Sequence, residues 1–170
     1  MNKKKGILFW ITGLSGSGKT SLALKVFNFI KKNYGPSVII SGDDLRNIFN
    51  YKKFDKNSRL KYALSYSKFC KEITNQNINV IFSTVSLYNK VRSWNKKNIP
   101  NYLEIYIETN IEKLINEKKK HFYRTKLVNI VGKNIKAEFP KKPDIRIINN
   151  FTRSINQLKI ELIKKISLKI

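Results

Sequence analysis

The segment 13–20 constrains the fold of this chain more than any other part of the sequence. It reads Gly-Leu-Ser-Gly-Ser-Gly-Lys-Thr and matches the phosphate-loop signature GxxxxGK(S/T) at every fixed position. The apolar run before it predicts a buried strand over residues 7–12, and the apolar stripe after it predicts an amphipathic helix over residues 19–32. A strand, a glycine-rich loop and a helix in this order are the context in which the signature binds nucleotide phosphates.

The predicted loop holds phosphate mainly with its backbone. Glycines let the chain curl so that several N–H groups point at phosphate oxygens, and the following helix adds the positive end of its dipole. We expect Lys19 to bridge the β- and γ-phosphates of ATP and the Thr20 hydroxyl to bind Mg²⁺. The predicted nucleotide contacts are Gly13, Leu14, Ser15, Gly16, Ser17, Gly18, Lys19, Thr20 and Ser21. ATP and Mg²⁺ are therefore the expected cofactors, but the loop does not identify the group that receives the phosphate.

The rest of the chain continues the alternation of strands and helices. Further strands are predicted at 38–41, 80–85, 102–107 and 145–148, and further helices at 57–74, 90–97, 110–119 and from Ile155 onward. Continuous apolar strands separated by helices are typical of a parallel sheet covered on both faces, so we predict an α/β fold with a five-stranded parallel sheet. The 170 residues suit a single domain. The basic, irregular segment 118–143 is predicted to form a lid over a charged site.

Composition limits the class of protein. Lys and Arg number 35 against 11 acidic residues, a formal net charge of +24. This charge suggests an anionic partner such as nucleotide, nucleic acid or a membrane surface, or it reflects a compositional bias, because Lys, Asn and Ile are abundant throughout. We favour the bias for most of the lysines.

Compartment is indicated by the cysteine count and the N-terminus. Cys70 is the only cysteine, which excludes an internal disulfide and fits a reducing compartment. The N-terminus has the basic start and apolar stretch of a signal peptide, but it continues directly into the phosphate loop without a cleavage site. No run approaches the ~20 apolar residues of a membrane span. We therefore expect a cytoplasmic protein with no membrane partner.

Two of the four aspartates are candidates for the catalytic acid. Asp43 and Asp44 follow the second predicted strand, at the sheet edge where open α/β folds place their sites. The third predicted strand ends in Ser83-Thr84-Val85, without the acid common at this position. Asp43 or Asp44 is left to orient Mg²⁺ or to accept a proton from an attacking hydroxyl. We favour Asp43 for this role and Asp44 as the cap of a short helix starting near Leu45.

Arginine and aromatic side chains suggest where an acceptor binds. Arg46, Arg59 and Arg92 lie near the starts of predicted helices in a chain that otherwise prefers lysine. This placement suggests bidentate phosphate recognition, although any one of them can be an ordinary surface charge. Phe54 stands alone among polar residues and is either a stacking platform for a base or a loop anchor in the core.

These segments together resemble the adenylylsulfate kinases from Phe9 to Pro143. The sequence WITGLSGSGKTSLA at 10–23 is similar to the family block WxTGLSGSGKTTLA, and SGDDLR at 41–46 is similar to DGDxxR. Phe54 and Arg59 match part of the later family block GFSxxDR, and Ser86, Tyr88 and Arg92 match part of SxISPYxxxR. Lys120 and Tyr123 match the ends of KGLY, and Gly132, Glu138 and Pro140 match part of FTGIDxPYExP.

The resemblance implies ATP-dependent phosphorylation of the ribose 3′-hydroxyl of a small nucleotide with a modified phosphate end. It assigns the catalytic role and the magnesium contact to Asp43, with Lys19 as a second catalytic residue. It places Ser86 near the transferred phosphate. It assigns substrate contacts to four residues, which are Arg46, Phe54, Arg59 and Lys120. It also suggests a homodimer.

The sequence departs from the family pattern on the acceptor side. Ile130 replaces the lid aromatic that, with the equivalent of Phe54, sandwiches the adenine of adenylylsulfate, and Tyr62 replaces an asparagine. Losing half of the sandwich removes a contact worth ~1–3 kcal/mol, which is compatible with a smaller base or with a ligand held by other groups. A shortened lid in a Lys/Asn/Ile-rich chain resembles the capsule-pathway branch, whose kinases act on cytidine diphosphoramidate. We predict that function, with Ile130 in the substrate site.

Two other functions remain open. The first is an adenylylsulfate kinase of sulfate activation whose lid has drifted. The second is a basic nucleic-acid-binding protein or RNA-end kinase, suggested by the net charge of +24. The sequence contains no array of aromatic residues for single-strand stacking and no known RNA module, so nucleic acid is the least favoured partner.

Overall fold

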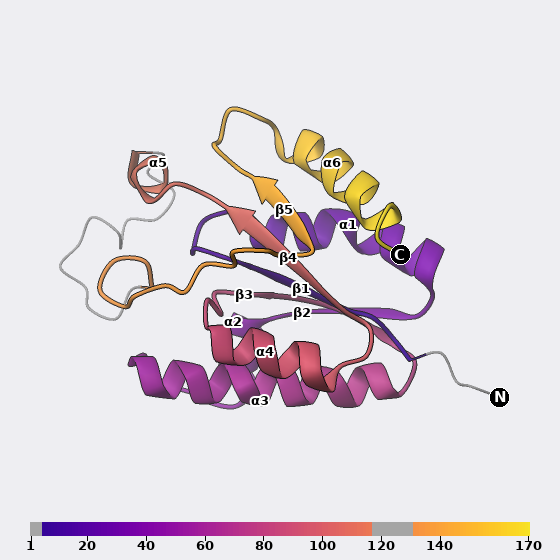
Figure 1. The fold of residues 1–170 in the computed structure, drawn as a ribbon, viewed down its shortest axis with the longest axis horizontal. Coiled ribbons are helices and arrows are strands. Elements are labelled where there is room, and N and C mark those ends of the chain that lie inside the picture. The colour runs from indigo at the N-terminus through magenta and orange to yellow at the C-terminus, as the bar shows by residue number, and fades with distance from the viewer. Residues whose placement is uncertain (1–4, 117–130) are drawn as a thin grey trace.

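The computed structural model describes residues 5–116 and 131–170, and of residues 115 and 116 only the backbone. The described residues form a five-stranded parallel sheet in the order β2-β3-β1-β4-β5 (Figure 1). The strands are β1 Leu8–Gly13, β2 Ser37–Ser41, β3 Asn79–Thr84, β4 Tyr102–Glu108 and β5 Ile145–Ile148. The helices are α1 Lys19–Tyr34, α2 Gly42–Ile48, α3 Lys56–Asn75, α4 Asn89–Asn98, α5 Ile111–Asn116 and α6 Ile155–Ser167.

Helices cover both faces of the sheet. Figure 1 shows α1 and α6 on one face and α2, α3 and α4 on the other. Alternate residues of β1 enter the two cores: Phe9 and Ile11 pack under α1 and α6, whereas Leu8 and Trp10 pack under α3 and α4. Both sets are fully buried because a central parallel strand has no solvent-facing side. The predicted α/β fold is confirmed.

The strand order places a topological switch point at the carboxyl ends of β1 and β3. These neighbouring strands continue into α1 and α4, which lie on opposite faces of the sheet (Figure 1). Connections that leave in opposite directions open a gap between them, and open α/β sheets bind ligands there. The loop after β1 is the phosphate loop, so the fold brings the predicted nucleotide site to this switch point.

Helix ends differ from the prediction where capping decides them. The helix containing Asp44 begins at Gly42, not near Leu45, because Ser41 caps it. Asn110 caps α5 as predicted, and its side chain accepts a hydrogen bond from the Glu112 backbone N–H at 2.7 Å. Of the predicted helix 110–119, and of the predicted lid 118–143, residues 117–130 lie outside the described residues. No helix within the described ranges is both long and apolar enough to cross a membrane.

Arg92 forms a buried ion pair instead of facing a phosphate site. Its Nε lies 3.3 Å from Glu104 Oε1, and its guanidinium also donates to Asn89. Arg92 is 9% exposed and Glu104 is 8% exposed. The proposed role in phosphate recognition is therefore wrong for this arginine, which joins α4 to β4.

Glu104 predicts a pH-dependent stability. Burial raises the pKa of this carboxyl from 4.5 to about 7, although Arg92 acts in the opposite direction. The folded state then binds the proton more tightly than the unfolded state, so this contribution to stability is complete below about pH 4.5 and is lost as pH rises through about 7. We expect the melting temperature of Glu104→Gln to vary less than that of the wild type across this window. Melting temperatures that change equally with pH in the two proteins would contradict the assignment.

Candidate active site

The phosphate loop curls around the Lys19 ammonium. Lys19 is only 7% exposed, and its Nζ donates to the Leu14 carbonyl at 2.7 Å. Gly18 has φ +92°, a left-handed conformation that L side chains rarely adopt, and it caps α1. A Cβ on Gly13 would lie 2.5 Å from the Ile107 carbonyl oxygen, so only glycine fits at the end of β1. The loop is built for close backbone approach around a fixed cation.

Asn149 braces the phosphate loop from the other end of the chain. It directly follows β5, it is buried, and its Nδ2 donates to the Ser17 carbonyl at 2.9 Å. Sequence reasoning missed this residue. The available signal was its place after a predicted strand, where carboxyl-end residues of a parallel sheet converge.

The candidate magnesium site lies at the carboxyl end of β3, where two hydroxyls meet and the helix that carries Asp43 begins nearby. Thr20 Oγ1 lies 3.3 Å from Ser83 Oγ, which occupies the end of β3 where the sequence offers no acid. A Cβ on Gly42 would lie 2.8 Å from Thr84 Oγ1, so the N-terminus of α2, with Asp43 in its first turn, packs against the same strand end. These hard oxygen donors fit Mg²⁺. Within residues 5–116 and 131–170 no group of three His, Cys, Asp or Glu side chains could hold a metal by itself.

The two adjacent aspartates have different environments. Asp44 Oδ2 accepts from the Ser41 backbone N–H at 2.9 Å, and Asp44 N–H donates to Ser41 Oγ at 3.1 Å. This capping box confirms that Asp44 serves the helix end. Asp43 is exposed and lies close enough to Arg59 and Tyr66 to influence the pKa of both groups. The capping box therefore engages Asp44 and leaves Asp43 outside it.

Arg46 and Arg59 share the ring of Phe54. Their guanidinium carbons lie 4.3 Å and 5.3 Å from the ring centroid. Phe54 is 47% exposed, so the alternative that it anchors its loop in the core is wrong. Burial lowers the pKa of Arg59, and the positive charge of Arg46 lowers it further. Two cations beside an exposed aromatic ring can bind an anionic group and a base.

Backbone carbonyls hold both arginines in place. Arg46 Nη1 donates to the carbonyls of Tyr51 at 2.9 Å and Lys53 at 3.1 Å. Arg59 Nε donates to the Phe54 carbonyl at 2.7 Å. The loop between α2 and α3 is therefore folded around these two side chains.

An aromatic group that sequence reasoning did not assign to the site lies behind Arg46. The rings of Tyr51 and Tyr62 stack with centroids 3.9 Å apart and an interplanar angle of 8°. Arg46 also lies over the Tyr62 ring, at 5.4 Å. Tyr66 packs next to this pair, and burial raises the pKa of its phenol to about 12. Tyr62 was recognised as a departure from the family pattern, but its stacking partner was not predicted.

Ser86 lies in a segment that is held from two sides. Its carbonyl accepts from Thr12 Oγ1 at 3.1 Å, and its buried Oγ has no hydrogen-bond partner among the described residues. The carbonyl of the next residue, Leu87, accepts a hydrogen bond from Glu138 N–H at 2.9 Å. The Glu138 carboxylate in turn accepts a hydrogen bond from Asn89 N–H at 2.6 Å. The end of the predicted lid thus packs on this segment. Lys120 and Ile130, the other predicted substrate residues, lie outside the described residues.

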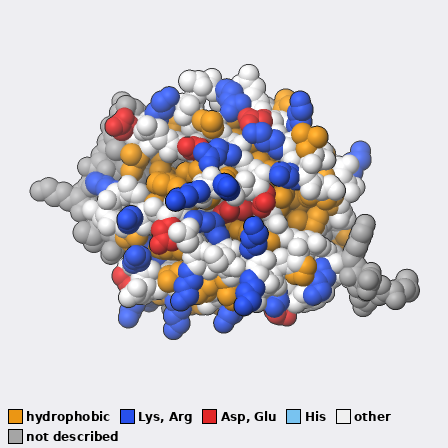
Figure 2. Space-filling view, in the orientation of Figure 1, with side chains coloured by type: hydrophobic (Ala, Val, Ile, Leu, Met, Phe, Trp, Pro, Cys, Tyr) orange, Lys and Arg blue, Asp and Glu red, His pale blue; other side chains and the backbone are white. Residues whose placement is uncertain are grey.

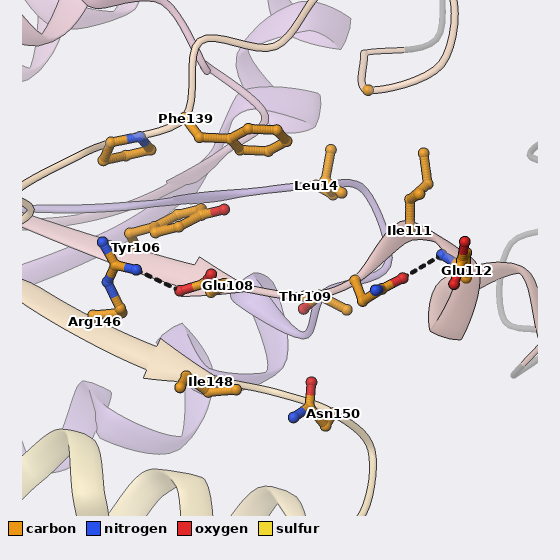
Figure 3. A pocket seen from close by; sticks show the side chains of 13 residues that line it. Leu14, Tyr106, Glu108, Thr109, Ile111, Glu112, Phe139, Arg146, Ile148 and Asn150 are labelled. Carbon is orange, nitrogen blue, oxygen red and sulfur yellow. Dashed lines mark hydrogen bonds and ion pairs between the residues drawn. The ribbon is translucent and has the colours of Figure 1, made fainter.

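A pocket of about 630 Å³ lies on the other side of the phosphate loop (Figure 3). Leu14 lines it from the loop, and Tyr106 and Ile148 line it from β4 and β5. Figure 3 shows Phe139 opposite Tyr106, with ring centroids 6.2 Å apart. The Glu108–Arg146 ion pair, at 2.8 Å, and Asn150 add polar groups. The pocket can take a planar group attached to phosphates on the loop.

Basic side chains are spread over the face that Figure 2 draws. Figure 2 shows Lys and Arg scattered across the viewed face with no single continuous patch. This distribution favours the compositional interpretation of the net charge on that face.

Known proteins are similar to this chain over most of its length. A family model described as "Adenylylsulphate kinase" matches residues 5–148. The chain belongs to the adenylylsulphate kinase family. It is 36% identical over 171 residues to the cytidine diphosphoramidate kinase of Campylobacter jejuni, covering 98% of this chain and 99% of the relative. It is 28% identical to the adenylyl-sulfate kinase of Halothermothrix orenii, covering 86% of this chain and 82% of the relative.

Solved members of the adenylylsulphate kinase family share the fold. The adenylylsulfate kinase of Mycobacterium tuberculosis, solved in complex with AMPPNP and APS, superposes with a TM-score of 0.84. The alignment covers 97% of this chain and 99% of that chain at 23% identity. The predicted resemblance is confirmed, and the relatives named here are kinases.

Proposed function

We propose that this chain is a single-domain, ATP-dependent kinase that phosphorylates the ribose 3′-hydroxyl of cytidine diphosphoramidate. The observation that carries the proposal is the 36% identity, over nearly the whole of both chains, to a cytidine diphosphoramidate kinase. The candidate acceptor residues support it, because Phe54 is exposed beside two arginines while Ile130 replaces the second aromatic of the family pattern. A single stacking ring suits a pyrimidine better than a purine.

Donor and acceptor bind on opposite sides of the phosphate loop in this proposal. Arg46, Arg59 and Phe54 belong to α2, α3 and the loop joining them, on the β2–β3 side, whereas the pocket at Tyr106 and Ile148 lies on the β4–β5 side. An in-line transfer needs the attacking hydroxyl and the leaving group on opposite sides of the transferred phosphorus. The pocket is therefore our candidate for the nucleoside of ATP.

The transfer itself uses few groups. Lys19 and the loop N–H groups hold the ATP phosphates. Asp43 accepts a hydrogen bond from the acceptor hydroxyl and takes its proton as the new O–P bond forms, while the bond between the γ-phosphorus and its bridging oxygen breaks and ADP leaves. Thr20 and Asp43 would hold Mg²⁺, with Ser83 beside them, and the ion when bound neutralises charge on the phosphates. Ser86 remains a proposed contact near the transferred phosphate, and Lys120 remains a proposed substrate contact.

The product serves phosphoramidate modification of a capsular polysaccharide in this proposal, and the enzyme is cytoplasmic, where ATP is available. A homodimer remains a prediction from the family resemblance. Nucleic acid is not proposed as a partner, since the basic side chains on the face in Figure 2 are scattered and form no groove.

Competing acceptors test the proposal directly. We expect kcat/KM for cytidine diphosphoramidate to exceed that for adenylylsulfate, measured as ATP consumption with each acceptor under identical conditions. Identification of the product by ³¹P NMR locates the new phosphate on the ribose. Better turnover of adenylylsulfate would instead favour the sulfate-activation enzyme. Salt-sensitive phosphorylation of RNA ends with neither small acceptor active would favour the third function.

A further inference from the structure

The guanidinium of Arg46 is held by more contacts than a flexible surface arginine needs. Two backbone carbonyls accept from its Nη1, and two aromatic rings, Phe54 and Tyr62, lie within 5.4 Å of its guanidinium carbon. One of the carbonyls belongs to Tyr51, whose ring stacks on Tyr62. Tyr51 therefore fixes Arg46 twice, through its carbonyl and through the ring that it supports.

This arrangement opposes a repulsion between like charges. Arg46 and Arg59 both lie over the Phe54 ring, and the charge of Arg46 lowers the pKa of Arg59. Two positive charges that share one ring repel each other. Aromatic faces attract cations, so the Phe54 and Tyr62 rings offset the repulsion before any anion is bound. The protein thus keeps two positive charges together in advance of binding, which reduces the cost of ordering them later.

We propose that Tyr62, supported by Tyr51, is a positioning residue that holds Arg46 ready for the phosphate-bearing end of the acceptor nucleotide and so sets acceptor affinity. The identity of that nucleotide rests on the proposed function, but the positioning role rests on the contacts of Arg46. Tyr62 acts through Arg46 and does not itself take part in the transfer.

The test compares Tyr62→Leu with Tyr62→Phe. Leucine keeps an apolar side chain but removes the aromatic face, so we expect KM for the acceptor to rise about fivefold to tenfold, with kcat and KM for ATP unchanged. Phenylalanine keeps the face and is expected to retain wild-type values. Phe69→Leu is the matched control, because it removes a ring from the same helix that packs on another ring, Phe49. Melting temperatures of all variants report any loss of folding.

A double-mutant cycle separates positioning from packing. If Tyr62 acts through Arg46, then Tyr62→Leu has no further effect on acceptor KM in an Arg46→Ala background. An equal effect in both backgrounds, or an unchanged acceptor KM in the single variant, overturns the inference.

Binding of cytidine 5′-diphosphate keeps the test independent of the reaction. Calorimetry is expected to show weaker binding by Tyr62→Leu and unchanged binding by Tyr62→Phe and Phe69→Leu. If the wild type turns over neither small acceptor, the proposed function fails, yet weaker diphosphate binding by Tyr62→Leu still supports the positioning role. No binding by the wild type, or equal binding by wild type and Tyr62→Leu, overturns it.

Discussion

Asp43→Asn is expected to lower kcat by at least about 10²-fold while the affinity for ATP changes little. Asparagine keeps the size of the side chain but cannot accept the proton of the attacking hydroxyl or contribute charge to a Mg²⁺ site. The phosphates of ATP are held mainly by the loop at residues 13–20, which this change does not touch. Single-turnover rates and ATP binding, measured on the same protein preparation, separate the two effects.

Asp44→Asn is the control for Asp43→Asn. The wild-type Asp44 lies next to Asp43 in the sequence and carries the same charge. Its carboxylate accepts a hydrogen bond from Ser41 N–H in the capping box of α2. An asparagine oxygen can still accept that bond, so we expect near-normal kcat and a small loss of stability. Near-normal turnover by Asp43→Asn, or a larger loss in Asp44→Asn, would place the catalytic carboxylate elsewhere.

Local pattern was enough to predict the sheet and most of its helices. The strands are continuous apolar runs because both faces of a parallel sheet are buried, and that signal needs no knowledge of distant residues. The predicted positions of the helix ends were less accurate. The start of α2 at Gly42 depends on Ser41 as N-cap and Asp44 as its partner, a reciprocal pair that apolar spacing does not reveal.

The candidate site follows from the sequence where a motif carries it, and it includes contacts between distant residues that the sequence pattern does not indicate. The phosphate loop and Asp43 follow from short segments. The contact between Thr20 and Ser83 joins residues 63 apart, and the contact between Asn149 and Ser17 joins residues 132 apart. Arg92 shows the converse error, since its place near a helix start resembled that of Arg46, yet the fold buries it against Glu104. Position along the chain cannot distinguish these two arginines, because the difference lies in what packs over them.

Lys19→Met is expected to reduce kcat/KM for ATP by about 10²–10³-fold, which is typical when a fixed charge or donor at the reacting group is removed. Methionine has a similar length and an apolar stem, so it can fill the buried space that Lys19 occupies. The stem therefore keeps its packing, and only the ammonium group that donates to Leu14 is lost.

The melting temperature distinguishes a catalytic lysine from a structural one. A buried ammonium is costly to desolvate, so replacing it with an apolar group of similar shape is expected to leave stability unchanged or to raise it. The matched control is Lys25→Met on the same helix, which removes an exposed charge and is expected to leave both turnover and stability near wild type. A marked loss of stability in Lys19→Met, together with retained turnover, would mean that Lys19 serves the loop and not the phosphates. Loss of turnover in a protein that melts at or above the wild-type temperature would assign the ammonium to phosphate transfer, because the loop would then have folded without it.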